Sequence, residues 1–349
     1  MPNAINQREE IQLKGQRTSA VSVIVPALNE EGSIGNLLDA LANQTSRPDQ
    51  VIVVDAGSRD RTRSEAEARS HRFAHFRILD CPGAYPGRAR NQGACLAENA
   101  HLLFLDCGLS IESDCVERLF SASSESEAVY GWVVPKTHSF FTECAAIAYL
   151  QPVKRGGEPV DRPTVPLLLI ELELFRRLNG FPEKLRSAED LLFLEELTRQ
   201  GVTMDFVPSA LGRWELCTSF RSTFRRFRTY SMHNLKAGLA RQWQRPLGLY
   251  YATWIAIVSL VLALTSQWLS LPLLLLAFLG LRGAKSLWRH REDIAGKPSR
   301  RLVQLPMVMA ILFVIDLATL SGTVDYLFQR FQSRTQPGFA ADEPRSKDA

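Results

Sequence analysis

The sequence lacks the short signatures that mark several common classes of protein. Its six cysteines include no Cys-x-x-Cys pair, which favours reduced thiols in a cytosolic compartment over a disulfide framework. No Walker loop (GxxxxGKS/T) occurs, and no GxGxxG follows the first predicted strand. His71 and His75 have the spacing of a helical zinc pair, but this stretch lacks the glutamate of HExxH and runs into a predicted strand. We therefore expect two solvated surface histidines there.

The amino-terminal residues and the overall charge carry little information about function. Residues 1–19 are polar and have no apolar core, so we expect a disordered lead-in and no signal peptide. No internal repeat is visible. The net charge of +4 decides little, but basic residues are unevenly placed. Residues 221–245 hold seven Lys/Arg and no acid, and residues 282–301 hold seven against two acids.

The stretch from Val21 to Asp60 organises the rest of the chain. Valines and isoleucines fill residues 21–25 and 51–54, as in strands buried on both faces, and apolar residues at helical spacing lie between them. A strand, a helix and a parallel strand form one right-handed crossover unit. In open α/β sheets the ligand lies beyond the carboxyl ends of the strands. Residues 26–30 and 55–60 should therefore border the same crevice.

The following residues continue the α/β pattern. Four more strands are predicted, at Phe73–Leu79, His101–Leu105, Ala128–Val134 and Thr164–Ile170. Four helices are predicted, at Arg88–Ala100, Cys115–Phe120, Glu171–Leu178 and Ser187–Gln200. In the last of these, Ser187 is the expected N-cap and Asp190 stands where a capping box has its acid.

Several motifs then recur in a specific order over about 200 residues: VSVIVPALNEEGSI, VIVVDAGSRDRT, GRARNQGA, LLFLDCG and AEDLLFLEEL. Together they resemble the GT-A glycosyltransferases of family 2. The resemblance implies an α/β fold with a Rossmann-like sheet, a nucleotide-diphospho-sugar transferase domain over residues 20–216.

The resemblance also implies a donor site. The turn residues and the acid after the second strand would border the nucleotide, with Asp55 bonded to base or ribose and Gly57 allowing close backbone approach. Asp60 would close this loop, or act only as a turn acid. A helix amino terminus with arginines suits a pyrophosphate, although one arginine should face solvent. These donor-site residues are Pro26, Ala27, Asn29, Glu30, Asp55, Gly57, Asp60, Arg88, Arg90 and Asn91.

Asp106 matches the first acid of the family's DxD motif, whose carboxylates hold Mg²⁺ or Mn²⁺ against the diphosphate. Here the motif reads Asp106-Cys107-Gly108. Gly108 has no side chain to offer, and a cysteine is a poor ligand for a hard cation, so metal dependence stays open. His233 is either a further ligand, as in some GT-A enzymes, or a packing residue.

Glu189 and Asp190 match the family's ED pair at a helix start. Asp190 would be the general base that takes the proton of the acceptor hydroxyl, and in-line attack with a single base gives inversion. The alternative is a capping acid, and both roles are compatible. Trp214 and Arg225 follow where members with membrane domains close the acceptor side, without a clean QxxRW motif.

The carboxyl-terminal third changes character. We expect a basic amphipathic interface helix over residues 217–245, a transmembrane hairpin over 246–284 and a basic cytoplasmic loop over 285–301. A third membrane segment over 302–328 contains Asp316 and spans, re-enters or lies at the interface. A disordered tail, 329–349, follows. Three spans would place the tail outside, against the positive-inside tendency of Arg330 and Arg334. A buried helical domain is the alternative.

These observations predict an inverting glycosyltransferase in the inner or plasma membrane with a cytoplasmic catalytic domain. Its donor would be a nucleotide-diphospho-sugar, and its acceptor a hydroxyl of a glycolipid, lipid-linked sugar or cell-envelope polysaccharide; no nucleic acid is expected. A polyprenyl phosphate is the alternative acceptor, but an ionised phosphate needs no base, so Asp190 favours the hydroxyl. The altered motif at Asp106 is the one feature that favours a non-catalytic scaffold. A nucleotidyltransferase would need a Gly-rich loop after the first strand.

Overall fold

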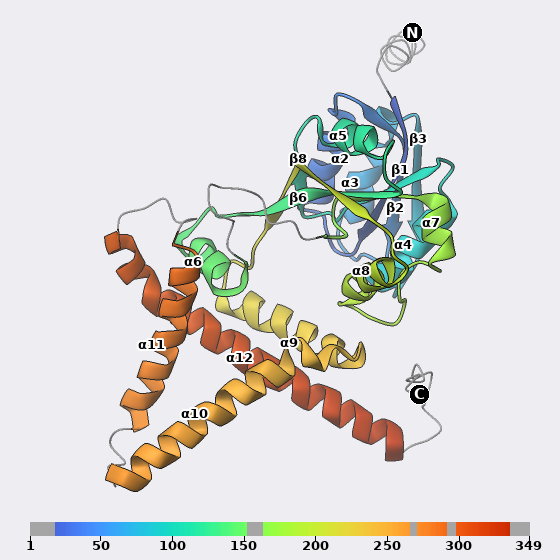
Figure 1. Ribbon diagram of the computed structural model, residues 1–349. Coiled ribbons are helices and arrows are strands. Elements are labelled where there is room, and N and C mark those ends of the chain that lie inside the picture. The colour runs from blue at the N-terminus through green and yellow to red at the C-terminus, as the bar shows by residue number, and fades with distance from the viewer. Residues whose placement is uncertain (1–17, 152–162, 266–270, 292–297, 336–349) are drawn as a thin grey trace. The chain divides into compact units, whose positions relative to one another are not determined.

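The computed structural model describes residues 18–151, 163–265, 271–291 and 298–335 (Figure 1). The chain divides into two units. The sheet unit comprises residues 1–146, 150–216 and 289–295, and the helical unit comprises residues 147–149, 217–288 and 296–349.

The sheet unit contains one eight-stranded mixed sheet with the order β3-β2-β1-β4-β7-β6-β8-β5. Strands β1 to β4 are mutually parallel, β7 runs antiparallel to β4 and β6, β8 is parallel to β6, and β5 is antiparallel to β8. The strands are β1 (Thr18–Ala27), β2 (Arg47–Asp55), β3 (His75–Asp80), β4 (His101–Phe104), β5 (Leu109–Ile111), β6 (Ala128–Lys136), β7 (Leu168–Glu171) and β8 (Met204–Glu215).

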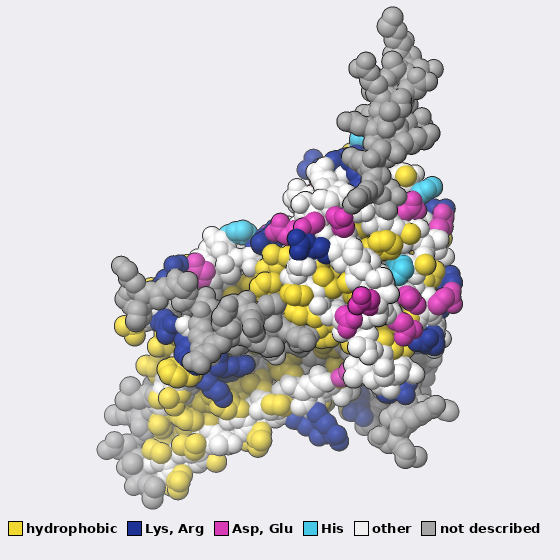
Figure 2. All heavy atoms as spheres, turned by 45° about the horizontal axis from the view of Figure 1, so that its top comes forward, with side chains coloured by type: hydrophobic (Ala, Val, Ile, Leu, Met, Phe, Trp, Pro, Cys, Tyr) yellow, Lys and Arg dark blue, Asp and Glu magenta, His cyan; other side chains and the backbone are white. Residues whose placement is uncertain are grey.

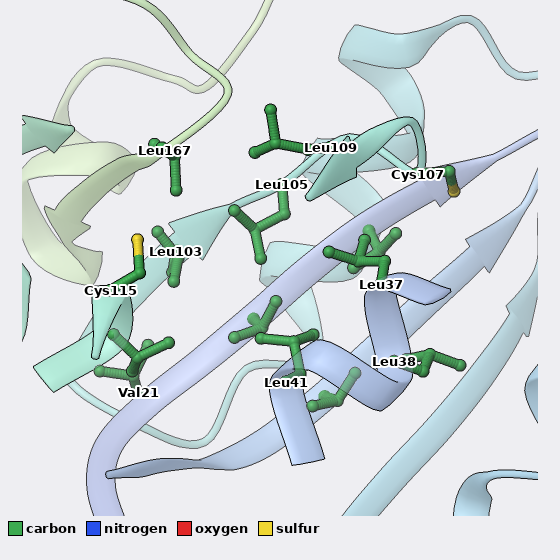
Figure 3. Close-up of a cluster of buried hydrophobic side chains, with 14 of the residues drawn as sticks. Val21, Leu37, Leu38, Leu41, Leu103, Leu105, Cys107, Leu109, Cys115 and Leu167 are labelled. Atoms are coloured by element: carbon green, nitrogen blue, oxygen red, sulfur yellow. The ribbon is translucent and has the colours of Figure 1, made fainter. Parts of the chain in front are cut away.

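Helices cover both faces of this sheet, because its central strands send apolar side chains to each side. Val23 and Val25 of β1 face one core cluster, and Ile24 between them faces the other. Figure 3 shows the first cluster, in which Leu37 and Leu41 pack beside β1. The helices of this unit are α2 (Ile34–Ala42), α3 (Thr62–Glu67), η1 (Ser70–Arg72), α4 (Pro86–Cys95), α5 (Cys115–Ala122), α6 (Phe140–Tyr149, whose last three residues belong to the helical unit), α7 (Leu172–Arg177) and α8 (Glu189–Arg199).

The predicted elements of this unit are present, with shifted ends, and one local prediction was wrong. Helix α8 begins at Glu189, and its N-cap position is taken by Ala188 at φ 73°, with no side-chain cap. The hydroxyl of Ser187, the expected cap, is buried without a hydrogen bond in the described part of the chain. Strands β5 and β8 were not predicted.

The described residues of the helical unit form four helices and a short 3-10 turn: α9 (Phe220–Lys236), η2 (Leu239–Arg241), α10 (Gln244–Thr265), α11 (Leu271–Arg289, whose last residue belongs to the sheet unit) and α12 (Pro298–Thr335). Ser219 caps α9 in a capping box with Ser222. Among the described residues, two segments are long and apolar enough to cross a membrane, Leu239–Ala263 and Arg300–Gln332. The apolar core of the first is fully unburied, whereas 44% of the second is buried.

Candidate functional site

The carboxyl ends of β1, β2 and β4 bring three predicted loops together. Ala27, the last residue of β1, is paired in register with Asp55, the last residue of β2. Beyond β4, the amide of Leu105 donates to the carbonyl of Ile24, and the thiol of Cys107 contacts the carbonyl oxygen of Pro26 at 3.3 Å. The residue ranges 26–30, 55–60 and 106–108 therefore border one edge of the sheet, as predicted for a ligand crevice.

Asp55 is buried and shapes its own loop. Its Oδ1 accepts hydrogen bonds from the amides of Gly57 (3.1 Å) and Ser58 (2.8 Å). Gly57 adopts φ 96°, a conformation that is strained for any residue with a Cβ. Within the described residues the second oxygen, Oδ2, makes no hydrogen bond. At the end of β2, Oδ1 of Asp55 is therefore hydrogen-bonded within the loop, and Oδ2 remains as a second acceptor.

Side chains of Asn29 and Asp60 join the first loop to the second. The backbone amide of Asn29 donates a hydrogen bond to Ser58 Oγ at 2.9 Å. The side-chain oxygen Asn29 Oδ1 accepts one from the backbone amide of Arg59, also at 2.9 Å. Asp60 accepts from the amides of Glu31 and Thr62. Desolvation alone would raise the pKa of Asp60, but these hydrogen bonds outweigh it and lower the pKa. Asp60 thus closes the loop as a turn acid, and Glu30 lies half-buried between the two loops.

Arg90 is the centre of the site. Its guanidinium donates to Asp106 Oδ1 at 2.8 Å and to Glu189 Oε1 at 2.9 Å. The side chain is 5% exposed and lies over the ring of Phe181, 5.3 Å from its centroid. Burial opposes the charge on Arg90, but the two carboxylates outweigh it and raise the pKa of Arg90. Arg88, two residues earlier on α4, is exposed, so one of the two predicted arginines faces solvent as expected.

Asn91 holds the loop that follows α7. Its Oδ1 accepts from the Phe181 amide (2.8 Å), and its Nδ2 donates to the Phe181 carbonyl (2.9 Å) and to Glu183 Oε1 (3.0 Å). The amide therefore pairs with the Phe181 backbone as a neighbouring strand would. Phe181 and Glu183 were not identified from the sequence.

Glu189 and Asp190 open α8 beside Arg90. Burial raises the pKa of Asp190; Arg90 opposes this shift and Asp106 adds to it. Burial likewise raises the pKa of Glu189, against the effect of Arg90. Glu189 Oε2 is buried without a hydrogen bond among the described residues. A half-buried carboxylate with a raised pKa is a stronger base than a solvated one, which suits proton abstraction.

The metal ligands expected from a full DxD motif are not all present. No group of three His, Cys, Asp or Glu within the described residues is arranged to hold a metal ion. Burial raises the pKa of the Cys107 thiol, which keeps it neutral, and one oxygen of Asp106 is taken by Arg90. The other Asp106 oxygen fits a Mg²⁺ ion held chiefly by phosphate oxygens and water, which is the usual mode for that ion.

Three predicted residues lie apart from this cluster along the chain. Trp214 is half-buried near the end of β8, paired with Leu109 of β5 and Pro135 of β6. Arg225 and His233 lie on α9 in the helical unit, the first exposed and the second 2% exposed. Their roles at the site remain predictions.

A protein-family comparison identifies the first part of the sheet unit. Residues 22–158 match the model of the family described as Glycosyl transferase family 2. This segment is a family 2 glycosyltransferase domain. Its mixed α/β sheet, with helices on both faces, is the GT-A fold that the motifs predicted. Glu189 and Asp190 lie outside the matched segment.

The glycosyltransferase domain also resembles curated bacterial proteins. An uncharacterized glycosyltransferase of Haemophilus influenzae is 27% identical over 188 residues, which cover 52% of this chain and 62% of that protein. An O-antigen chain rhamnosyltransferase of Salmonella typhimurium is 24% identical, with 59% of this chain and 70% of that protein covered. The chain spans 33% to 66% of the length of the first three curated relatives it matches.

Solved structures are similar to this chain at lower sequence identity. S. aureus TarS in complex with UDP-GlcNAc aligns over 89% of this chain and 92% of that chain, at 18% identity and a TM-score of 0.48. The same protein in complex with UDP aligns at a TM-score of 0.45.

Proposed function

We propose that this protein is an inverting glycosyltransferase that moves a sugar from a nucleotide-diphospho-sugar to a hydroxyl of a membrane-associated acceptor. The observation that carries the proposal is the Arg90 bridge. It holds Asp106, beyond the end of β4, and Glu189, which precedes Asp190, on the same guanidinium. Arg90 therefore joins Asp106, which is expected near the diphosphate, to Glu189, which is next to the expected base Asp190.

In the proposed reaction, Asp55 receives the nucleoside and the backbone around Gly57 approaches it. A Mg²⁺ or Mn²⁺ ion, when bound through Asp106 and the diphosphate, would offset the negative charge of the leaving group. Asp190 accepts the proton of the acceptor hydroxyl. The hydroxyl oxygen forms a bond to the anomeric carbon as the bond from that carbon to the diphosphate oxygen breaks. Nucleoside diphosphate leaves, and the anomeric configuration is inverted.

Two features support a membrane-associated acceptor. The apolar core of the segment Leu239–Ala263 is unburied, and basic side chains of α9 precede the segment in the chain. We propose that the protein is integral to the inner or plasma membrane, with its sheet unit in the cytoplasm. Among the relatives, the Salmonella protein is named for O-antigen chains, and a Bacillus spizizenii protein, 26% identical, is a poly(ribitol-phosphate) beta-glucosyltransferase. These names favour a cell-envelope polysaccharide or its lipid-linked precursor as acceptor.

Release of nucleoside diphosphate tests the proposal. The detergent-purified protein would be incubated with UDP-, GDP- and dTDP-sugars, membrane lipid extract, and Mg²⁺, Mn²⁺ or EDTA. One donor should give release that Asp190→Asn lowers by about 10²–10⁴-fold. The control Glu173→Gln, at an exposed acid on α7, should keep this release. Release that Asp190→Asn leaves unchanged would remove the base and favour a polyprenyl phosphate as acceptor. Absence of both donor binding and release would favour a non-catalytic scaffold.

A further inference from the structure

One face of α12 is an exposed apolar stripe. The stripe consists of Leu302, Val303, Phe313, Leu317, Leu320, Val324, Leu327, Phe328 and Phe331, each at least 40% exposed. At about 100° of rotation per residue, all nine side chains fall within an arc of about 120°, on the same side of the helix. At 1.5 Å per residue the stripe is about 44 Å long. The hydrocarbon core of a bilayer is only about 30 Å thick, so the stripe exceeds what an upright span requires.

The opposite face of α12 is packed against α9 in the carboxyl-terminal half. Ser231 Oγ donates to the carbonyl of Thr319 at 2.8 Å, and Arg228 makes a two-pronged ion pair with Asp325 at 2.5 and 3.0 Å. The helices touch at Gly322, where a Cβ would come within 2.3 Å of the Arg228 carbonyl oxygen. In Figure 1 the two helices lie side by side. The depth of α9 in a membrane therefore fixes the depth of this half of α12.

Helix α9 is too basic to enter hydrocarbon. It carries four arginines and one lysine over 17 residues, and Arg221, Arg225 and Arg228 are exposed. Each arginine at the bilayer centre costs about 2.5–3.5 kcal/mol even on the most permissive scale. Helix α9, and the part of α12 from about Thr319 onward, must therefore remain at the level of the lipid headgroups.

The middle of α12 is held at the base of the α10–α11 hairpin. Asp316, which is 6% exposed, accepts a hydrogen bond from Tyr251 of α10 at 2.5 Å and forms an ion pair with Arg282 of α11. Arg282 lies where the uncharged stretch of α11 ends and basic residues begin, which is the position of a headgroup-level anchor. If α12 crossed the bilayer upright, Asp316 would be near the bilayer centre. Its ion-pair partner Arg282, however, is expected at the membrane surface.

We propose that α12 does not cross the bilayer but lies along its cytoplasmic surface, with the apolar stripe resting on the acyl chains of anionic lipids. Helix α9 lies beside it at headgroup level, and only the α10–α11 hairpin inserts. Figure 2 shows the apolar side chains gathered over the lower part of the helical unit, with basic side chains beside them. Arg330 then stays on the cytoplasmic side of the membrane, in agreement with the positive-inside tendency.

This inference rests on the proposed membrane attachment but not on catalysis, so transferase activity and helix placement can fail separately. Single cysteines would be introduced by Phe313→Cys, Leu320→Cys and Phe328→Cys in a Cys95→Ser background, since Cys95 is the exposed native cysteine of the described residues. Each variant would carry an environment-sensitive fluorophore in phosphatidylglycerol/phosphatidylcholine vesicles. Lipids with quenchers near the headgroup or deep in the acyl chains then report depth.

We expect all three sites to lie at the same shallow depth, about 5–10 Å below the headgroups. A depth that changes steadily along the helix, with one site at the centre, would overturn the proposal in favour of a span. Protection from both quenchers, together with cross-linking between copies, would overturn it in favour of a dimer contact. A fluorescent-protein fusion at residue 349 in cells should be fluorescent and resist externally added protease; an external reporter signal would overturn the proposal independently of the vesicle result.

Discussion

Arg90 Nη1 donates to Glu189 Oε1 at 2.9 Å, although the two residues are 99 positions apart in the chain. Both side chains are nearly fully buried, and Phe181 covers the guanidinium. This contact holds α4 and α8 together where the donor and acceptor halves of the proposed site meet. It also places a permanent positive charge beside the candidate base.

Replacing Arg90 should destabilise the protein far more than replacing its neighbour. Arg90→Met leaves Glu189 buried and unpaired, and breaking one side of a buried ion pair costs about 3–5 kcal/mol. Urea denaturation followed by tryptophan fluorescence measures the free energy of unfolding. Arg88→Met, at the exposed position on the same helix, is the control. Equal losses in the two variants would show that the buried pair contributes no stability.

The ionisation of Asp190 should make both the rate of transfer and the free energy of unfolding depend on pH. Burial raises its pKa above the ordinary value of 3.8, so the folded state holds this proton more tightly than the unfolded state. The associated stability is fully present below pH 3.8 and is lost as pH rises through the higher folded pKa. Transfer should have the opposite dependence, because the base works only when ionised.

Asp190→Asn should accordingly gain stability above that pH range while losing about 10²–10⁴-fold in kcat. Thermal unfolding and nucleoside diphosphate release between pH 4 and 8, measured on the same preparations, check both effects. If the variant keeps the wild-type acid limb in its rate profile, the limb belongs to another group.

Gly108→Asp should create a tighter metal site. A Cβ built at Gly108 meets no atom within 4 Å, so a side chain fits there. A second carboxylate beside Asp106 would give a hard cation two protein ligands. We expect roughly tenfold tighter Mn²⁺ binding in the presence of UDP, about 1.4 kcal/mol, by isothermal titration calorimetry. The isosteric control Gly108→Asn should bind as the native protein does. An aspartate variant no tighter than the asparagine variant would exclude position 108 from metal binding.

Asn91→Ala should loosen the loop that leads to the candidate base. The amide makes two hydrogen bonds with the Phe181 backbone, and leaving buried groups unpaired costs about 1–3 kcal/mol. Limited proteolysis should show faster cleavage between α7 and α8, and kcat should fall more than KM rises. Gln92→Ala, the exposed next residue, is the control. A variant that affects only donor affinity would instead indicate direct contact between Asn91 and the donor.

The periodic strands were readable from the sequence because their pattern is local. Val23, Ile24 and Val25 are buried wherever the partner strands lie, since each face of β1 receives a helix. The acids at the ends of β2 and β4 followed from the same pattern. Strand β8 did not: its segment includes Pro208 and Gly212, and it is extended because β6 and β5 pair with it.

Local rules also misjudged the start of α8. Ser187 and Asp190 fit a capping box by spacing, but α8 begins one residue later than such a box requires and Ala188 takes the cap position. The loop before α8 is held by contacts of Phe181 with Asn91 and with Phe193, and contacts between residues so far apart in the chain leave no local pattern.

By itself the sequence determined six of the eight strands, β1 to β4, β6 and β7, together with the family and the acids at the ends of β2 and β4. Only the tertiary structure decided which arginine is buried, which carboxylates it joins, and why the pKa of Asp190 is raised. It also decided that α12 is packed on one face and exposed on the other. The physical reason is range: periodicity and propensity act over a few residues, whereas burial and ion pairing depend on groups brought together by the fold.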